Sequence, residues 1–239
     1  MANLWTYEQK FDGLNDGDLN GQDSWSGATE FDVTTDAAAL YEGTKGLKIY
    51  QPAGLKTIKR TLPASIESGE FWISVKATET TQLYPRININ NDGDVIDLEI
   101  FFWSDGTIKY YSRDATDYVQ IDSLTYSADT WIRLGVRFRC TGAAAFEGLN
   151  ERTAKVSIDG GDNWSSELEF EAASGTDINY LELVGFADTG NYNYFDYISP
   201  NYVAPVVTDI KSVNGLAYAS VKSKNGLAIG SIKSINNLE

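Results

Sequence analysis

Two carboxylates alternate along one apolar stretch of the chain, Val95-Ile96-Asp97-Leu98-Glu99, and are the first candidates for chemistry. Alternate side chains of a β-strand point to the same face, so Asp97 and Glu99 are expected to lie side by side. Two carboxylates placed in this way can act as acid and nucleophile in glycoside hydrolysis. They can also accept hydrogen bonds from the hydroxyl groups of a sugar that is bound and not cleaved.

Other catalytic chemistries are excluded by residue type. The 239 residues include no histidine, and Cys140 is the only cysteine. Ser-His-Asp and Cys-His catalysis, histidine metal ligation, a cysteine-rich zinc site and an intrachain disulfide are therefore ruled out. Cys140 continues the inward-facing positions of an alternating stretch, Trp131 to Cys140, so we expect a small buried core residue and no reactive thiol.

The elements that position these residues are predicted to be strands. Apolar and polar residues alternate with period two in many short stretches, Gly-, Asn- and Asp-rich turns recur every eight to twelve residues, and no helical period extends over a useful length. This pattern predicts an all-β protein, an antiparallel β-sandwich of the jelly-roll kind. The expected strands cover residues 5–11, 46–51, 56–62, 71–76, 86–90, 95–103, 107–113, 117–121, 131–140, 154–158, 180–187 and 194–198.

Several of these strands mix aromatic and polar side chains on the face opposite the apolar one. If these faces meet on the concave side of a jelly roll, they offer aromatic platforms and hydrogen-bonding groups suited to a sugar. The alternative is a solvated sheet face with arginine-carboxylate pairs, which is common on exposed strands. The candidate glycan-binding residues are Trp72, Arg86, Asn88, Asp97, Glu99, Trp103, Trp131 and Arg133.

The C-terminal residues 209–239 repeat a unit of eleven residues, IKSVNGLAYAS, then VKSKNGLAIGS, then a truncated IKSINNLE. Asn-Gly favours a type I′ turn, so each unit predicts a small hairpin. Because so short a hairpin is marginal alone, we expect other chains to complete the fold, and the alternative is a disordered tail. The residues expected to mediate oligomerisation or anchoring are Ile210, Asn214, Gly215, Leu216, Val221, Asn225, Gly226, Leu227, Ile232 and Leu238.

The chain is thus expected to divide into a β-sandwich domain (1–199), a linker (200–208) and the repeat tail (209–239). Residues 206–239 carry four lysines against Asp209 and Glu239, a balance of +2. The rest of the chain therefore carries −17, which gives the net charge of −15. So acidic a body would be repelled by nucleic acid phosphates. No stretch approaches the roughly 20 apolar residues of a membrane span, and the N-terminus does not resemble a signal peptide, which predicts synthesis in the cytoplasm.

Three segments of the body resemble the concanavalin A-like, LamG-type jelly roll: FDGLNDGDLNGQDSWSG near the start, GTKGLKI at 43–49 and YFDYIS at 194–199. Such domains bind glycans, bind proteins or serve as scaffolds. The resemblance also implies a structural calcium ion between the opening loop and the last strand, where Asp12, Asp16, Asp18 and Asp196 offer oxygen ligands. Asp-rich turns that bind no metal are the alternative reading of the same residues.

The laminarinase-type glucanases on this fold carry a Glu-x-Asp-x-Glu motif, which residues 95–99 resemble in part. Asp97 and Glu99 match its second and third positions, whereas Val95 stands where the motif places the nucleophile. Valine cannot attack a glycosidic bond, so the resemblance argues against hydrolysis and we expect no enzymatic activity.

The tandem IKSxNG units resemble the C-terminal repeats of tailed-phage virion proteins and of related bacterial surface proteins. This resemblance implies localisation to the virion, contacts with other virion proteins and a homo-oligomer, for which a trimer is expected by analogy. We therefore predict a non-enzymatic phage structural protein, of capsid-decoration, head-fibre or tail-fibre type, that displays a lectin-like jelly roll for attachment to a cell-surface glycan. The alternatives are a bacterial extracellular carbohydrate-binding module and a degenerate glycan hydrolase.

Overall fold

The computed structural model describes residues 4–49, 55–80, 85–172, 175–186 and 192–202, together with the backbone of four two-residue strands near the C-terminus. The chain divides into two compact units, Met1–Ala204 and Pro205–Glu239. The only helical element described is a short 3₁₀ turn, η1 (Ala37–Ala39). Among the described residues there is accordingly no helix with the length and apolar character of a membrane span.

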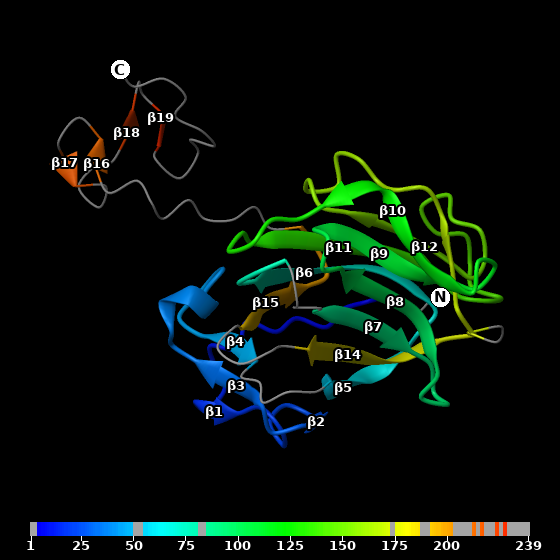
Figure 1. The fold of residues 1–239 in the computed structure, drawn as a ribbon, viewed down its shortest axis with the longest axis horizontal. Coiled ribbons are helices and arrows are strands. Elements are labelled where there is room, and N and C mark those ends of the chain that lie inside the picture. Colours follow the sequence, from blue (N-terminus) through cyan, green and yellow to red (C-terminus); the bar gives the residue numbers. More distant parts are fainter. Residues whose placement is uncertain are drawn as a thin grey trace. The chain divides into compact units, whose positions relative to one another are not determined.

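The first unit is a sandwich of two antiparallel sheets (Figure 1), which confirms the predicted fold class. The eight-stranded sheet has the order β1 (Gly17–Asp18), β3 (Phe31–Thr34), β4 (Gly46–Ile49), β15 (Asn193–Ser199), β6 (Ser68–Ala77), β11 (Ile132–Arg139), β12 (Thr153–Ser157) and β13 (Leu168–Glu169). The seven-stranded sheet has the order β10 (Asp117–Thr125), β9 (Thr107–Ser112), β8 (Ile96–Phe102), β7 (Arg86–Asn90), β14 (Ile178–Phe186), β5 (Leu55–Ile66) and β2 (Trp25–Gly27).

The core lies between the two sheets and is built from the apolar positions of the alternating stretches. Phe71, Ile73 and Val75 of β6 face it from one sheet, and Ile100 and Phe102 of β8 face it from the other. All five are at most 1% exposed. Cys140 is fully buried in the same core, as the alternation predicted, and burial raises the pKa of its thiol.

The N-terminal segment is not the strand that we expected over Trp5–Phe11. It forms only isolated bridges, between Leu4 and Ser68 and between Gln9 and Ile198. Trp5 is buried, and its ring stacks on that of Phe71 at 4.4 Å. The apolar alternation here therefore reflects side chains packed on the sandwich and not a ladder of strand pairs. Four short strands of two to four residues each are not among those predicted from the sequence: β1, β2, β3 and β13.

The outer face of the eight-stranded sheet is covered by loops. Trp72 on β6 is 1% exposed, because the rings of Trp164 and Tyr202 pack on it with centroids 5.6 and 4.9 Å away. Its indole also lies over Gly135 on β11, where a Cβ atom would come within 2.5 Å of the ring. Around Trp72 this face is therefore a second buried layer and not open to a ligand.

The second unit contains two hairpins of minimal length. β16 (Ser212–Val213) pairs with β17 (Leu216–Ala217), and β18 (Ser223–Lys224) pairs with β19 (Leu227–Ala228). Each pairing spans the two-residue Asn-Gly connection that the repeat predicts. Leu216 and Leu227 lie on strands of which only the backbone is described. The other tail residues that we predicted to act in assembly lie outside the described residues: Ile210, Asn214, Gly215, Val221, Asn225, Gly226, Ile232 and Leu238.

Candidate functional site

The eight candidate glycan-binding residues do not share one face, so the condition for a single site made of all of them is not met. Arg86, Asn88 and Glu99 lie on the outer face of the seven-stranded sheet, and Trp103 follows β8 directly. The other sheet carries Trp72 on β6 and Arg133 on β11, and Trp131 directly precedes β11. The physical reason is strand pairing, because β6 pairs with β15 and β11, whereas β7 and β8 pair with each other in the other sheet.

The residues on the eight-stranded sheet make structural contacts. Arg133 is 5% exposed, and its guanidinium donates hydrogen bonds to the carbonyl oxygen of Tyr197 and to the hydroxyls of Ser74 and Ser199. Burial lowers the pKa of Arg133 to about 10. The Trp131 ring packs against that of Tyr41 at 5.7 Å. Arg133 thus links β11 to β6 and β15, and Trp131 packs on the loop that holds Tyr41.

Asp97 also departs from the expected position. Ile89 pairs with Leu98 and Asn90 pairs with Ile96, so Asp97 is the extra residue of a β-bulge. It is fully buried, 3.4 Å from the Asn91 amide nitrogen and packed against Gly175. Burial raises the pKa of Asp97 to about 7. The pair of displayed carboxylates that the alternation predicted is therefore absent, because only Glu99 remains on the face.

Glu99 is held by two donors on the outer face of the seven-stranded sheet. Arg86 on β7 donates from Nη1 to Oε1 at 2.8 Å, and the Tyr118 hydroxyl on β10 donates to Oε2 at 3.0 Å. The guanidinium of Arg86 lies 3.7 Å above the centre of the Phe101 ring. A cation placed over an aromatic face is attracted by the ring quadrupole, so this contact helps to hold the Arg86 guanidinium in place beside Glu99.

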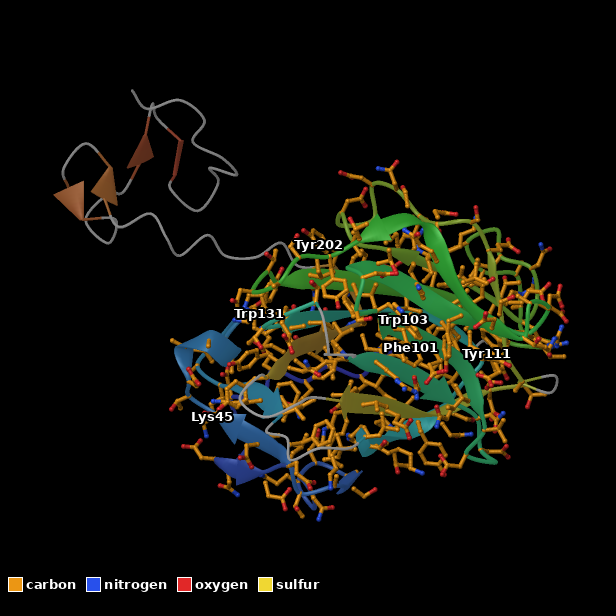
Figure 2. All side chains as sticks on the ribbon, viewed as in Figure 1. Lys45, Phe101, Trp103, Tyr111, Trp131 and Tyr202 are labelled. Atoms are coloured by element: carbon orange, nitrogen blue, oxygen red, sulfur yellow. The ribbon has the colours of Figure 1, made fainter. Side chains whose placement is uncertain are left out.

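An aromatic cluster lies beside this ion pair, and we call Phe101, Trp103, Tyr111 and Tyr118 the outer aromatic cluster. The Tyr118 ring contacts those of Phe101, Trp103 and Tyr111, with centroids 4.4, 5.3 and 5.3 Å away. Figure 2 shows Phe101, Trp103 and Tyr111 grouped over this sheet, whereas Trp131 and Tyr202 lie apart from them. Phe101 is buried, and the other three rings are partly exposed, so the cluster offers an apolar platform to a ligand.

Tyr111 and Tyr118 were missed in the sequence analysis. They face each other across the hairpin of β9 and β10. The sequence does hold a signal for this pair. A turn lies between the two strands, and a tyrosine stands at a matching distance on either side of it.

A polar row continues across the sheet from the cluster. Lys59 on β5, Glu182 on β14, Asn88 on β7 and Glu99 on β8 are successive cross-strand partners. The Asn88 amide nitrogen donates to Glu182 Oε1 at 2.7 Å, and burial raises the pKa of Glu182. Lys59 and Glu182 were also missed, because their registers with β7 are set by pairings between segments distant in sequence.

The four aspartates proposed as calcium ligands do not form one cluster. Asp12 accepts hydrogen bonds from the backbone N–H of Thr44 and of Lys45, and Asp16 pairs with Lys45 at 2.9 Å. Asp196 accepts from the backbone N–H groups of Tyr41, Glu42 and Tyr197.

The part of the chain that the structure describes holds no group of three Asp, Glu, His or Cys side chains placed to bind a metal. Asp18 lies on β1 and accepts from the backbone of Asn20, so the residues present do not fit the ion.

We therefore expect calcium to leave the stability of the protein unchanged. An ion bound only by the folded state would raise the melting temperature in proportion to its affinity. Here the candidate carboxylates already have protein partners. Melting curves recorded with calcium and with a chelator should coincide. A higher melting temperature with calcium, lost in Asp196→Asn, would contradict this expectation.

No protein-family model and no curated protein matches the sequence. Solved structures do match the fold. A sialidase gives a TM-score of 0.58 at 12% identity over 86% of this chain, which spans only 19% of that protein. The Crh5 transglycosylase in complex with NAG gives 0.54 at 16% identity, over 84% of this chain and 85% of that one. The laminarinase from Rhodothermus marinus gives 0.51 at 12% identity, over 85% and 99%. The fold is thus the concanavalin A-like jelly roll.

Proposed function

We propose that this protein binds glycan chains on the outer face of its seven-stranded sheet. The observation that carries the proposal is the outer aromatic cluster, with its partly exposed rings directly beside the Arg86–Glu99 ion pair. Sugar rings stack on aromatic faces, and their hydroxyls need fixed charged and polar partners nearby. Glycan-acting proteins among the solved structures of this fold add support for such a ligand.

Removing one ring of the cluster should weaken glycan binding. We expect Trp103→Ala and Tyr111→Ala each to lower the affinity for a bound oligosaccharide by about tenfold, or about 1.4 kcal/mol. The ligand would first be found on a glycan array and the affinities then measured by titration calorimetry. The matched control is Tyr202→Ala, which removes an exposed ring that packs against the other sheet. Equal losses in all three variants would contradict the proposed site.

We also propose that binding occurs without hydrolysis. Val95 is 51% exposed at the position where the related glucanases carry a nucleophile. Asp97, which would stand between the two catalytic groups, is fully buried in the bulge. A retaining enzyme needs two carboxyl groups that flank the bond, and on this strand only Glu99, which is 5% exposed, lies on the outer face. Release of reducing ends from a bound glycan, abolished by Glu99→Gln, would overturn this part of the proposal.

For the biological setting we propose a phage virion, in which the repeat tail joins copies of this chain or anchors it to another virion protein. The support is the eleven-residue repeat, whose hairpins are too small to bury an apolar face alone. A bacterial carbohydrate-binding module with a surface-attachment tail is the second candidate, because the same repeats resemble those of bacterial surface proteins.

Solution mass distinguishes the roles of the tail. We expect the intact chain to be an oligomer, with a trimer as the expected state, and a chain that ends at Ala204 to be a monomer. Light scattering on both samples measures this directly. The shorter chain retains the whole of the first compact unit, so loss of assembly would not reflect unfolding. A monomeric intact chain would contradict self-association and favour anchoring to a different protein.

A further inference from the structure

Acidic side chains outnumber cations around Glu99 on the outer face of the seven-stranded sheet. Glu182 and Glu99 flank Asn88 in register on three successive strands. Glu171 follows β13, and burial together with the charge of Glu99 raises its pKa. Arg86 pairs with Glu99 at 2.8 Å, whereas neither Glu171 nor Glu182 forms an ion pair with any described residue. Lys59, the cross-strand partner of Glu182, pairs instead with Asp94 at 2.6 Å. The face therefore carries more negative than positive charge.

Two buried side-chain amides on β7 show that this face also lacks hydrogen-bond donors. Asn88 is 1% exposed and Asn90 is 2% exposed. Their nitrogens face the carboxylates of Glu182 and Asp94, at 2.7 and 3.4 Å. Because an ionised carboxylate only accepts, these contacts orient both amides, and both carbonyl oxygens are left without a partner. Buried polar atoms normally have partners, so a ligand rich in donors would suit this face.

A metal ion is a poor candidate for the missing charge. The described residues hold no cluster of three metal-ligating side chains, and the carboxylates of Glu182 and Glu99 stand on either side of Asn88, two strands apart. Strands lie about 4.8 Å apart, so the Cα atoms of these two glutamates are separated by roughly 10 Å. An organic cation with several N–H donors spans such a distance more readily than a single ion does.

We infer that the glycan bound at this face is cationic, an oligosaccharide of amino sugars with free protonated amines. An ammonium group brings one positive charge and three donors, which match the carboxylates and the unpartnered amide oxygens. The adjacent rings of Trp103 and Tyr118 provide the flat platform that favours a sugar over a basic peptide segment. This inference rests on the proposed function and narrows its ligand class.

The test compares two pentasaccharides that differ only in the amine. Titration calorimetry at about pH 6, where a primary amine is protonated, measures the glucosamine pentamer and its N-acetylated counterpart. We expect the amine form to bind at least tenfold more tightly and to lose much of this advantage in high salt, which screens exposed charges. Glu182→Gln keeps the shape and removes the charge, and it should lower affinity for the amine form by about tenfold and so reduce the difference between the two pentamers.

The control is Glu8→Gln, which removes the same charge from the N-terminal segment, where Glu8 lies 3.9 Å from Lys10. It should bind both pentamers as the unmodified protein does. Equal affinity for both pentamers, or no effect of Glu182→Gln, would overturn the inference and leave glycan binding itself intact. Tight binding of oligolysine without binding of the glucosamine pentamer would overturn it in favour of a basic peptide. Failure of every glycan on the array would instead overturn the proposed function.

Discussion

Replacement of Gly135 by alanine is expected to cost about 3 kcal/mol of folding free energy, although it adds a single methyl group. The new Cβ would lie 2.5 Å from the far edge of the Trp72 indole. That ring has no room to retreat, because Trp164 and Tyr202 pack on it and its Nε1 donates to Glu70 at 2.6 Å. The cost is steric, since Gly135 has no positive φ. Urea unfolding of the purified variant measures it.

Gly13→Ala is the matched control, because a Cβ at that position meets no atom within 4 Å and the φ is not positive. It should be neutral or slightly stabilising through the unfolded state. A second variant, Trp72→Phe combined with Gly135→Ala, shortens the ring that the methyl group strikes. The loss of unfolding free energy in this double variant should be smaller than the sum of the losses in the two single variants, because the two residues are in contact. Similar stability of the Gly135→Ala and Gly13→Ala proteins would contradict the packing argument.

Replacement of Asp97 by asparagine is expected to stabilise the protein at neutral and higher pH. Burial raises the pKa of Asp97 from its ordinary 3.8 to about 7. At 1.36 kcal/mol for each pKa unit, its ionisation in the folded state costs up to about 4 kcal/mol. The folded state binds the proton more tightly than the unfolded state, so protonated Asp97 contributes to the free energy of unfolding. This contribution is fully present below about pH 4 and is lost as pH rises through about 7.

The measurement is the free energy of unfolding of both proteins from pH 4 to pH 8. The asparagine variant and the unmodified protein should be similar at pH 4, and the variant should become increasingly more stable toward pH 8. Asp114→Asn provides the control, since Asp114 is exposed in the hairpin of β9 and β10. If Asp97→Asn and the unmodified protein show parallel curves, Asp97 is ionised at little cost in the folded state and the prediction fails.

Most of the sandwich strands could be predicted from local pattern alone. The alternation from Ile132 to Phe138 places its apolar residues in the core, and the strand over Arg86–Asn90 has the bounds that the sequence indicated. The reason is physical, because a half-buried strand must alternate wherever one face meets the core. Strands of two to four residues, such as β1 and β13, carry too few positions for any period to appear.

The candidate site was only half predictable, because it depends on which strands share a sheet. Trp72 and Arg86 sit in similar alternating stretches, yet they belong to different sheets through pairings of β6 with β11 and of β7 with β8. Asp97 was misplaced for another reason, since a bulge breaks the alternation at one residue without any local signal. Tyr118 and Glu182 could be assigned to the site only once β10 is known to pair with β9, and β14 with β7.

The central positions of β14 and β15 have a consequence for how the protein is made. β15 lies between β4 and β6, and β14 lies between β5 and β7, although both follow those strands by roughly 90 to 145 residues. Folds with such distant pairings form slowly, in milliseconds to seconds. On the ribosome the seven-stranded sheet lacks a central strand until Phe186 has been synthesised, and the eight-stranded sheet lacks one until Ser199 has been synthesised. Until then the neighbouring strands have unpaired edges, which favour aggregation. Premature stops before Asn193 should therefore yield insoluble chains, whereas those after Tyr202 leave a closed domain.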